Sequence, residues 1–262
     1  MKKLKDSRFG QVIEPESPIE LLNLIAHGGD ESDTAVRMWR GQSDEQWLLD
    51  SAAYRKMLLS KSDDRMEWHV AYYEKGLLEK ARHKGFGRLD GRTLSDFELL
   101  ARLQHHGAAT RLIDATRSGL IGLYFACSGN FDSAGMLFGI HCSHLGGGEG
   151  KLLDETYDER VQSIAKLNHS QTWEPPVVSA RIAAQHSQFI YSIIKPGLSH
   201  GSLAIEKPNY LLAIRIPAQH KPTYLKMLSA NFDITLLSLF PDIDGFGRAY
   251  GASREQWANE RW

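Results

Sequence analysis

The residues of this chain whose types best suit chemistry lie together in one segment, 104–116. It reads Gln-His-His-Gly-Ala-Ala-Thr-Arg-Leu-Ile-Asp-Ala-Thr and has neither helical nor strand periodicity. Charged side chains beside apolar segments must be paired, hydrogen-bonded or exposed in a cleft. Because small molecules usually bind in clefts with apolar walls and a few polar groups, we expect Arg111 or Asp114 to reach such a cleft. The structural alternative is a buried ion pair between these two residues.

Two adjacent histidines, His105 and His106, lie near the start of this segment. Histidine can act as a general base, a metal ligand or a hydrogen-bond donor near neutral pH. The structural alternative is the end of a helix, where histidine interacts favourably with the helix dipole and Gly107 takes the first position beyond the helix. The sequence leaves both interpretations open.

A second group, Trp39-Arg40-Gly41-Gln42, ends a short apolar stretch that is typical of a strand. An arginine at the end of a strand can present its planar, five-donor guanidinium to a phosphate or a carboxylate. Gly41 would let the backbone approach a ligand closely. The alternative is a turn at the end of the strand with a surface arginine.

Aromatic and amide side chains supply further candidates. Tyr124 lies in the apolar run 120–127, where an aromatic ring is either a stacking surface for a ligand or part of the core. The stretch 181–189 resembles a strand, a polar turn and a second strand, and its Gln185 and Gln188 can orient a ribose hydroxyl or an amide. Alternatively, both glutamines are solvated turn residues.

Helical patterns dominate the first half of the chain, and most strand patterns come later, which predicts an α+β fold. The expected helices are one through Ile19–Ala26 that ends at Gly28-Gly29, Asp64–Lys84, one capped by Thr93 or Ser95 that runs through Leu103, Gly119–Cys127, Lys221–Ser229, Thr235–Leu239 and the C-terminal tail. The expected strands are Ala35–Trp39, Gly135–Cys142, Val177–Ile182, Gln188–Ile194 and Tyr210–Ile216, with a mobile glycine-rich loop at 146–150.

Length and composition narrow the class of protein. The 262 residues contain no stretch typical of a linker, so we expect one domain spanning 1–262. The formal net charge of −1 gives no overall attraction to nucleic acid or membranes. The two cysteines lie in apolar stretches, as is typical of reduced thiols in a cytoplasmic protein. We find no signal peptide, and no apolar run approaches the length of a membrane span.

Several common catalytic patterns are incomplete. The glycine-rich loop 146–151 lacks the spacing and the Ser or Thr of a P-loop, and no Gly-X-Ser-X-Gly elbow occurs. His141, Cys142 and His144 lack a second ligand cluster at zinc spacing, so we expect no metal. Residues 242–245 are too short a match for a calcium loop and are expected to end one helix and start another.

Taken together, four segments of the chain resemble blocks of the FRG domain family, which is named for its aromatic-Arg-Gly motif. They occur in the same order and run from about residue 39 to 246, inside an expected domain core of about 34–250. The similar segments are Trp39-Arg40-Gly41-Gln42, Leu103–Thr116 followed by Leu123–Cys127, Arg181–Gln185 with Phe189, and Leu239–Gly245.

The resemblance implies a layout similar to that of ADP-ribosyltransferases, in which small mixed or antiparallel sheets form a cleft that holds NAD. It implies that Arg40 anchors the dinucleotide. Gln185 takes the place of the acidic residue that such folds often carry on a late strand; a glutamine supplies no negative charge, and Asp114 is the nearest substitute. The residues that the resemblance places around NAD are Arg40, Gly41, Gln42, Thr110, Arg111, Tyr124, Phe125, Arg181 and Phe189.

The chemistry that follows from the resemblance needs positioning and electrostatics rather than a metal. Arg40 and Arg111 would hold the pyrophosphate, and Tyr124 or Phe125 would line the nicotinamide pocket. Asp114 would stabilise positive charge, and His105 or His106 would deprotonate the acceptor. The expected catalytic residues are Arg40, Asp114, Gln185 and His105.

The resemblance therefore predicts an NAD-dependent ADP-ribosyltransferase, a toxin or anti-phage effector that an antitoxin protein neutralises. Its acceptor would be a nucleic-acid base, for example in single-stranded RNA, or a protein side chain. Two alternatives stay open: a nucleotide or ADP-ribose sensor without turnover, and a metal-independent nucleic-acid hydrolase that uses His105, His106 and Asp114. The candidates for a basic groove are Lys221, Lys226, Arg248 and Arg254.

Overall fold

The computed structural model describes residues 1–27, 37–58, 66–148, 150, 154–195, 197–205 and 211–251. The expected helix stop at Gly28-Gly29, the expected helical C-terminal tail and Arg254 lie outside these residues. The expected domain limits 1–262 therefore also extend beyond them.

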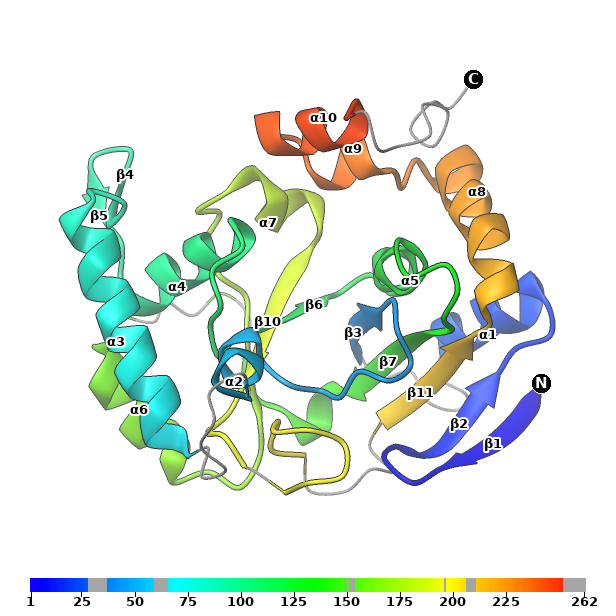
Figure 1. The fold of residues 1–262 in the computed structure, drawn as a ribbon, viewed down its shortest axis with the longest axis horizontal. Coiled ribbons are helices and arrows are strands. Elements are labelled where there is room, and N and C mark those ends of the chain that lie inside the picture. Colours follow the sequence, from blue (N-terminus) through cyan, green and yellow to red (C-terminus); the bar gives the residue numbers. More distant parts are fainter. Residues whose placement is uncertain are drawn as a thin grey trace.

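Over this part of the chain, a mixed sheet of nine strands runs through the molecule (Figure 1). Two neighbouring pairs, β2–β11 and β8–β9, are parallel, and the other pairs are antiparallel. In spatial order the strands are β1 (Lys2–Asp6), β2 (Gly10–Glu14), β11 (Leu211–Ile216), β7 (Gly135–His141), β3 (Arg37–Gln42), β6 (Ile113–Thr116), β10 (Ser187–Tyr191), β9 (Gln171–Trp173) and β8 (Gly146–Gly148).

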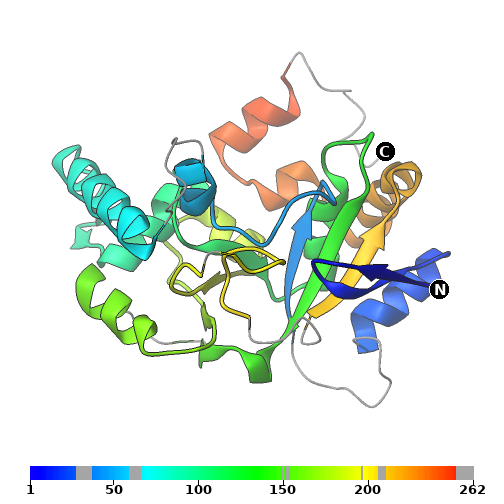
Figure 2. The ribbon, with the colours of Figure 1, turned by 60° about the horizontal axis from the view of Figure 1, so that its bottom comes forward.

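Helices gather at both ends of this sheet and along one side of it. In Figure 1, α3, α4 and α6 lie at one end, α1 and α8 at the other, and α9 and α10 along the top, an arrangement that Figure 2 shows from below. The helices are α1 (Pro18–His27), α2 (Ala52–Leu58), α3 (Glu67–His83), α4 (Asp96–His105), α5 (Gly119–Cys127), α6 (Tyr157–Ala165), α7 (Ala180–Ala184), α8 (Lys221–Phe232), α9 (Leu236–Leu239) and α10 (Ile243–Ala249), with short 3-10 turns at Cys142–His144 and Ala218–His220 and a small hairpin of β4 (Arg88–Leu89) and β5 (Arg92–Thr93).

The α+β class agrees with the sequence, but the expected helical N-terminal half and the small sheets that form a cleft are not confirmed. The chain begins with the hairpin β1–β2, and these strands join one large sheet. β1 reads Lys-Lys-Leu-Lys-Asp and is mostly exposed. The lysines of an edge strand disfavour pairing with other chains. Because such a strand lacks alternating apolar residues, no sequence pattern predicts it.

Two local expectations from the sequence are wrong. Residues 177–182 do not form a strand; after the Pro175-Pro176 pair, Ala180–Ala184 turn into the short helix α7, in keeping with their alanine content. Residues Gly146–Gly148 are not a loop, because their backbone pairs in parallel with β9. Strand pairing uses main-chain groups, so glycines join a sheet edge without any side-chain pattern.

Helix α5 is apolar throughout and packs between the sheet and helix α8. It begins at Ser118, whose hydroxyl accepts from the Ile121 N–H at 3.4 Å. On the opposite face of the sheet a second core contains Met38, Phe138 and Ile190. Trp39 of β3 therefore packs toward α5, while its neighbours in the strand face the other side.

Helix α4 carries the segment singled out in the sequence. The expected capping box is confirmed: Ser95 Oγ accepts from the Glu98 N–H at 3.3 Å, and Glu98 Oε2 accepts from the Ser95 N–H at 2.9 Å. The helix ends at His105, and Gly107 follows with a left-handed φ of +88°. The structural interpretation of His105-His106-Gly107 as a helix end is therefore confirmed.

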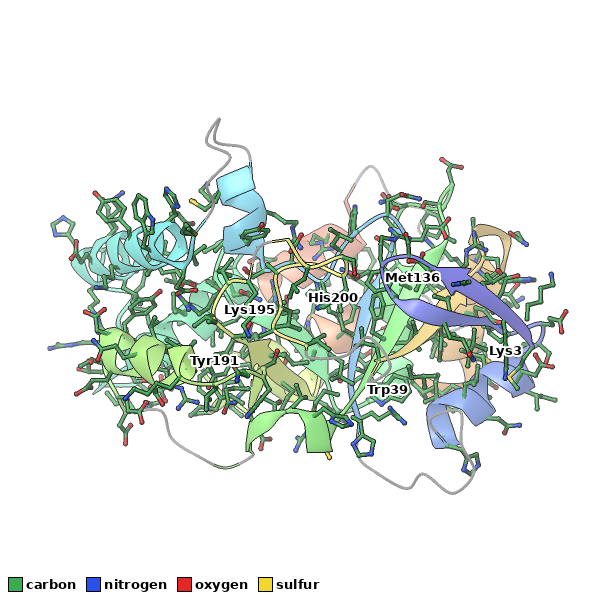
Figure 3. The ribbon with its side chains drawn as sticks, turned by 90° about the horizontal axis from the view of Figure 1, so that it is seen from below. Lys3, Trp39, Met136, Tyr191, Lys195 and His200 are labelled. Atoms are coloured by element: carbon green, nitrogen blue, oxygen red, sulfur yellow. The ribbon has the colours of Figure 1, made fainter. Side chains whose placement is uncertain are left out.

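Strand β3 pairs with β7 over its whole length but with β6 at one position, Trp39 opposite Thr116. Beyond that pair the two strands separate. Figure 3 shows Trp39 between Tyr191 of β10 and Lys3 of β1, in keeping with the strand order. The separation of β3 from β6 leaves a gap in the middle of the sheet.

Candidate functional site

A pocket of about 260 Å³ lies where β3 and β6 separate. All four segments noted in the sequence contribute to its walls, although they are distant along the chain. The lining residues are Trp39, Arg40, Gly41, Gln104, His105, Asp114, Ala115, Thr116, Phe125, Arg181, Gln185 and Phe240.

Arg40 lies on β3, and its side chain spans the gap between the strands. Its Nη1 donates to the main-chain carbonyl oxygen of Asp114 at 2.7 Å, and its buried Nε has no hydrogen-bond partner. Burial lowers the pKa of the guanidinium to about 10; nearby Asp114 offsets part of this effect, and Arg55 adds to it. Arg40 makes no ion pair with a carboxylate of the described residues, so it is a charged group poorly compensated by the protein itself.

Asp114 supplies a carboxylate to the same pocket, and its side chain is exposed there. Its Oδ1 accepts from Gln104 Nε2 at 2.9 Å. The residue lies on β6 opposite Phe189 of β10, so the strand pairing fixes its backbone. The arrangement places one anionic group within the same small pocket as the Arg40 cation.

His105 lies at the C-terminal end of α4 and lines the pocket. Its Nδ1 is 3.0 Å from Ser179 Oγ, and its ring packs against Phe189 with 5.6 Å between centroids. Burial lowers the pKa of the imidazole. The neutral form is therefore favoured. In the tautomer whose Nδ1–H donates to Ser179 Oγ, Nε2 carries no hydrogen and can accept a proton, and it makes no hydrogen bond to a described residue.

Aromatic rings form the apolar wall. Phe125 of α5 and Phe240, which follows α9, both line the pocket and meet edge to face with 6.1 Å between centroids. Trp39 lines it from β3. A flat apolar wall beside charged groups is a suitable surface for a heteroaromatic ring.

Arg181 also lines the pocket, but its guanidinium is occupied by protein groups. Nε and Nη2 donate to the two carboxylate oxygens of Asp242 at 2.5 and 2.9 Å, and Nη1 donates to the His105 carbonyl oxygen at 2.5 Å. The Arg181 hydrogen bond lowers the pKa of Asp242 to about 2. This pair links α7 to α10 and thereby positions Phe240, over which the Arg181 guanidinium lies at 5.1 Å.

Arg111 does not reach the cleft, contrary to expectation, and it does not pair with Asp114. It is fully buried outside the pocket lining. Its Nε donates to Glu74 Oε2 at 2.7 Å, its Nη2 lies 2.8 Å from Glu67 Oε1, and it also donates to Tyr157. Glu74 lies on α3, so Arg111 fastens this helix to the segment before β6 and has a structural role.

Of the remaining predicted residues, some line the pocket and others are buried outside its lining. Gln185 lines the pocket, but it caps α7 rather than lying on a strand, and its Nε2 donates to the Leu239 carbonyl oxygen at 3.0 Å. Gln188, the other amide candidate, is fully buried on β10 and donates to Thr172 Oγ1 at 2.9 Å. Thr110 is fully buried and donates to Gln104 Oε1.

Three other predicted residues pack behind the pocket and are not part of its lining. Tyr124 is buried in the core around α5 and meets Phe125 edge to face. Phe189 is fully buried beneath His105. Gln42 is buried, and its Nε2 donates to the Leu48 carbonyl oxygen at 3.0 Å.

Gly41 lines the pocket, but contact within the protein explains why it is a glycine. A Cβ at this position would lie 1.9 Å from the Gly122 carbonyl oxygen and 2.5 Å from the Ala126 nitrogen of α5. The glycine therefore allows β3 to approach α5, and this contact places Arg40 beside the pocket.

Of the four cations suggested for a basic groove, Lys221 cannot contribute to one. Lys221 is fully buried, and its Nζ donates to the carbonyl oxygens of Ser43, Gly129 and Asn130 at 2.7, 2.9 and 2.9 Å. It holds loops together and faces no solvent. Arg248 is exposed and lies 4.9 Å from the Phe240 ring.

Searches for other kinds of site give two findings about the described residues. They contain no group of three His, Cys, Asp or Glu side chains arranged to hold a metal ion. Their helices are too short or too polar to cross a bilayer.

Five lining residues stand inside the quoted sequence segments but were not predicted as site residues: Trp39, Gln104, Ala115, Thr116 and Phe240. Gln104 begins the central segment, and Phe240 lies in the last one. A glutamine and a phenylalanine carry no specific chemical pattern, so proximity to His105 and Asp242 was the available signal.

The comparison with protein families agrees with the first two segments that resemble the FRG domain family, Trp39–Gln42 and Leu103–Thr116 with Leu123–Cys127. Residues 36–134 match the FRG domain family model. The match covers Arg40, His105, Asp114 and Phe125, and it ends before α7 and α9. It supports the FRG domain family for this part of the chain. No curated protein and no solved structure matches the chain.

Proposed function

We propose that this protein is an NAD-dependent ADP-ribosyltransferase whose NAD site is the pocket around Arg40 and Asp114. The observation that supports this most directly is the state of Arg40. Of the three predicted arginines, Arg111 and Arg181 pair with carboxylates, whereas Arg40 makes no ion pair with a described carboxylate and its buried Nε has no hydrogen-bond partner. A buried cation of this kind favours an anionic ligand such as a phosphate group.

The other walls fit the nicotinamide end of a dinucleotide. Phe125 and Phe240 offer aromatic surface, and Asp114 offers negative charge beside it. A pocket of about 260 Å³ is at the small end for ligand sites. We therefore infer that it takes the nicotinamide ring and its ribose, with the pyrophosphate against Arg40 and the adenosine outside the pocket.

The residues around this end have distinct tasks in the transfer. When the C1′–nitrogen bond of NAD breaks, the electron pair leaves with nicotinamide, and the ribose carbon becomes positively charged. Asp114 stabilises that charge because its carboxylate shares the pocket. The lone pair of an acceptor nitrogen or oxygen forms the new bond to C1′, and His105 Nε2 takes the proton that the acceptor loses.

The acceptor and the biological setting extend the proposal. A nucleic-acid base or a protein side chain would enter beside His105, and the protein would act as a toxin or anti-phage effector in the cytoplasm. An antitoxin protein that covers the pocket would neutralise it. If so, expression should arrest bacterial growth and Asp114→Asn should relieve the arrest. Asp132→Asn, at an exposed position in the turn before β7, is the matched control.

One observation favours a second candidate, a sensor that binds a nucleotide or ADP-ribose without turnover. Asp114 is the single carboxylate among the described lining residues, and the amide of Gln185 is turned to a main-chain carbonyl. A binder needs Arg40 and the aromatic wall but no second acid.

Nicotinamide release by the purified protein separates the two functions. The transferase releases nicotinamide from NAD, and Asp114→Asn stops this release while NAD still binds. A sensor binds NAD or ADP-ribose with equal affinity before and after Asp114→Asn and releases no nicotinamide.

A further inference from the structure

The side-chain amide of Gln104 is held at both ends. Its Nε2 donates to Asp114 Oδ1 and to the Leu112 carbonyl oxygen, each at 2.9 Å. Its Oε1 accepts from the hydroxyl of Thr110. One amide thus connects the end of α4 to three positions of the segment that leads into β6.

The partners of the donor end fix which way round this amide points. The Leu112 carbonyl oxygen and the Asp114 carboxylate only accept hydrogen bonds, so Nε2 must face them. Oε1 therefore faces Thr110, whose Oγ1 accepts from the Leu112 N–H at 3.2 Å and whose own hydrogen is donated to Gln104. A reversed amide would place its oxygen against two acceptors.

We propose that Gln104 is the positioning residue of this site: its amide, held at its oxygen end by Thr110, holds the Asp114 carboxylate in the pocket. This inference rests on the proposed function of Asp114. Gln104 engages Oδ1, and Oδ2 makes no hydrogen bond to a described residue, which leaves Oδ2 available to the reacting centre. Because Arg40 holds the main-chain oxygen of the same residue, Asp114 is fixed through both its backbone and its side chain.

Variants of Thr110 test the positioning role of Gln104 without changing any residue that contacts a ligand. It is fully buried and is not part of the pocket lining, so it contacts no substrate there. Any effect of its hydroxyl on turnover passes through Gln104 or through the fold. Thr110→Ser keeps the hydroxyl, while Thr110→Val keeps the shape and removes the hydroxyl.

The kinetic experiment compares these variants with Gln104→Met and with Thr93→Val, an exposed control in the β4–β5 hairpin. Gln104→Met should lower kcat roughly 10- to 100-fold, the effect of one hydrogen bond to a charged group, and Thr110→Val should lower kcat roughly 3- to 10-fold, the effect of one neutral hydrogen bond. Both variants should leave KM for NAD nearly unchanged. Thr110→Ser should restore kcat. In an Asp114→Asn background, Thr110→Val should cause no further loss. A rise in KM alone, or fully additive losses in the double variant, would overturn the proposal.

A second measurement does not depend on turnover. The side-chain amide resonances of Gln104 in a nitrogen–proton NMR spectrum should move in Thr110→Val and in Asp114→Asn, and stay in place in Asp132→Asn. If the wild-type protein releases no nicotinamide but these resonances move, the proposed function fails and the Gln104 arrangement stands. If they do not move, the positioning role is wrong whatever the activity.

Discussion

Arg40 and Asp114 are joined across the point where two central strands separate, because the Arg40 guanidinium donates to the Asp114 carbonyl oxygen at 2.7 Å. The bond uses the main chain of Asp114, so its carboxylate stays available to the pocket. The same contact leaves Arg40 Nε without a protein partner. A cation and an anion thus share one small pocket without neutralising each other through an ion pair.

Replacing Arg40 tests the anion site. Arg40→Gln should weaken NAD binding by roughly 10- to 100-fold, because a charged hydrogen-bond donor to phosphate is lost. Arg40→Lys should recover part of the affinity, since it keeps the charge but not the planar donor geometry. Calorimetric titration with NAD measures both, and Arg88→Gln on the exposed β4–β5 hairpin is the control. Equal affinity in all four proteins would remove Arg40 from the site.

Replacing Asp114 tests the electrostatic role. Asp114→Asn keeps the acceptor for Gln104 but removes the charge, so kcat for nicotinamide release should fall by about 100- to 1000-fold. KM for NAD should change little, because the charge matters most once the C1′ bond is breaking. Steady-state kinetics beside Asp132→Asn measures the effect. A variant that loses affinity and keeps kcat would assign Asp114 to ground-state binding.

The pH dependence of turnover tests His105 as the base. Burial lowers the pKa of His105, so its neutral, proton-accepting form persists to lower pH than that of an exposed histidine. Turnover should therefore fall only below about pH 6.5, the ordinary histidine value. In His105→Asn this acid limb should disappear together with most of the rate, whereas His83→Asn at the exposed end of α3 should keep it. An acid limb that survives in His105→Asn would point to another base.

Arg111 is predicted to matter for folding rather than for binding. Arg111→Met leaves Glu74 buried and uncompensated, which should lower the free energy of unfolding by about 3–5 kcal/mol. Adding Glu74→Gln should recover part of this loss, because the unpaired charge is removed. Urea unfolding measures the change, with Arg88→Met as the exposed control. A loss below about 1 kcal/mol, the value of a surface pair, would contradict the buried network.

Replacing two glycines by alanine should change the free energy of unfolding in opposite directions. Gly41→Ala should lower the free energy of unfolding by about 1–3 kcal/mol, because the new Cβ would lie 1.9 Å from the Gly122 carbonyl oxygen. Gly76→Ala, in α3 with nothing within 4 Å of the new Cβ, should raise it by about 0.5–1 kcal/mol. Thermal unfolding of the two variants and the wild-type protein measures both changes. A harmless Gly41→Ala would mean that β3 does not need to approach α5 this closely.

The sequence predicted those elements whose signals are local. Helix α5 occupies the expected range, since nine residues between Ser118 and Ser128 are apolar or glycine. Helix α4 begins at the expected capping box, and α10 begins at Asp242, as expected. Strand β1 and strand β8 were missed because a charged edge strand and a run of glycines are defined by their partners in the sheet.

The segments that line the pocket were predictable from the sequence, but the different partners of their arginines were not. Arg40, Arg111 and Arg181 look equivalent in the sequence, each lying beside apolar residues. Their difference depends on partners far along the chain: Glu74 is 37 residues from Arg111, and Asp242 is 61 residues from Arg181. Such pairings arise from tertiary packing, which no local pattern encodes.

The most direct test of the account follows labelled ADP-ribose. The protein is incubated with NAD labelled in its adenosine phosphate and with a bacterial extract, beside Arg40→Gln, Asp114→Asn and Asp132→Asn. The account predicts label on macromolecules with the wild-type protein and Asp132→Asn but not with the other two variants, and digestion by nuclease or protease then names the acceptor class. Absence of both transferred label and released nicotinamide with the wild-type protein would contradict the transferase.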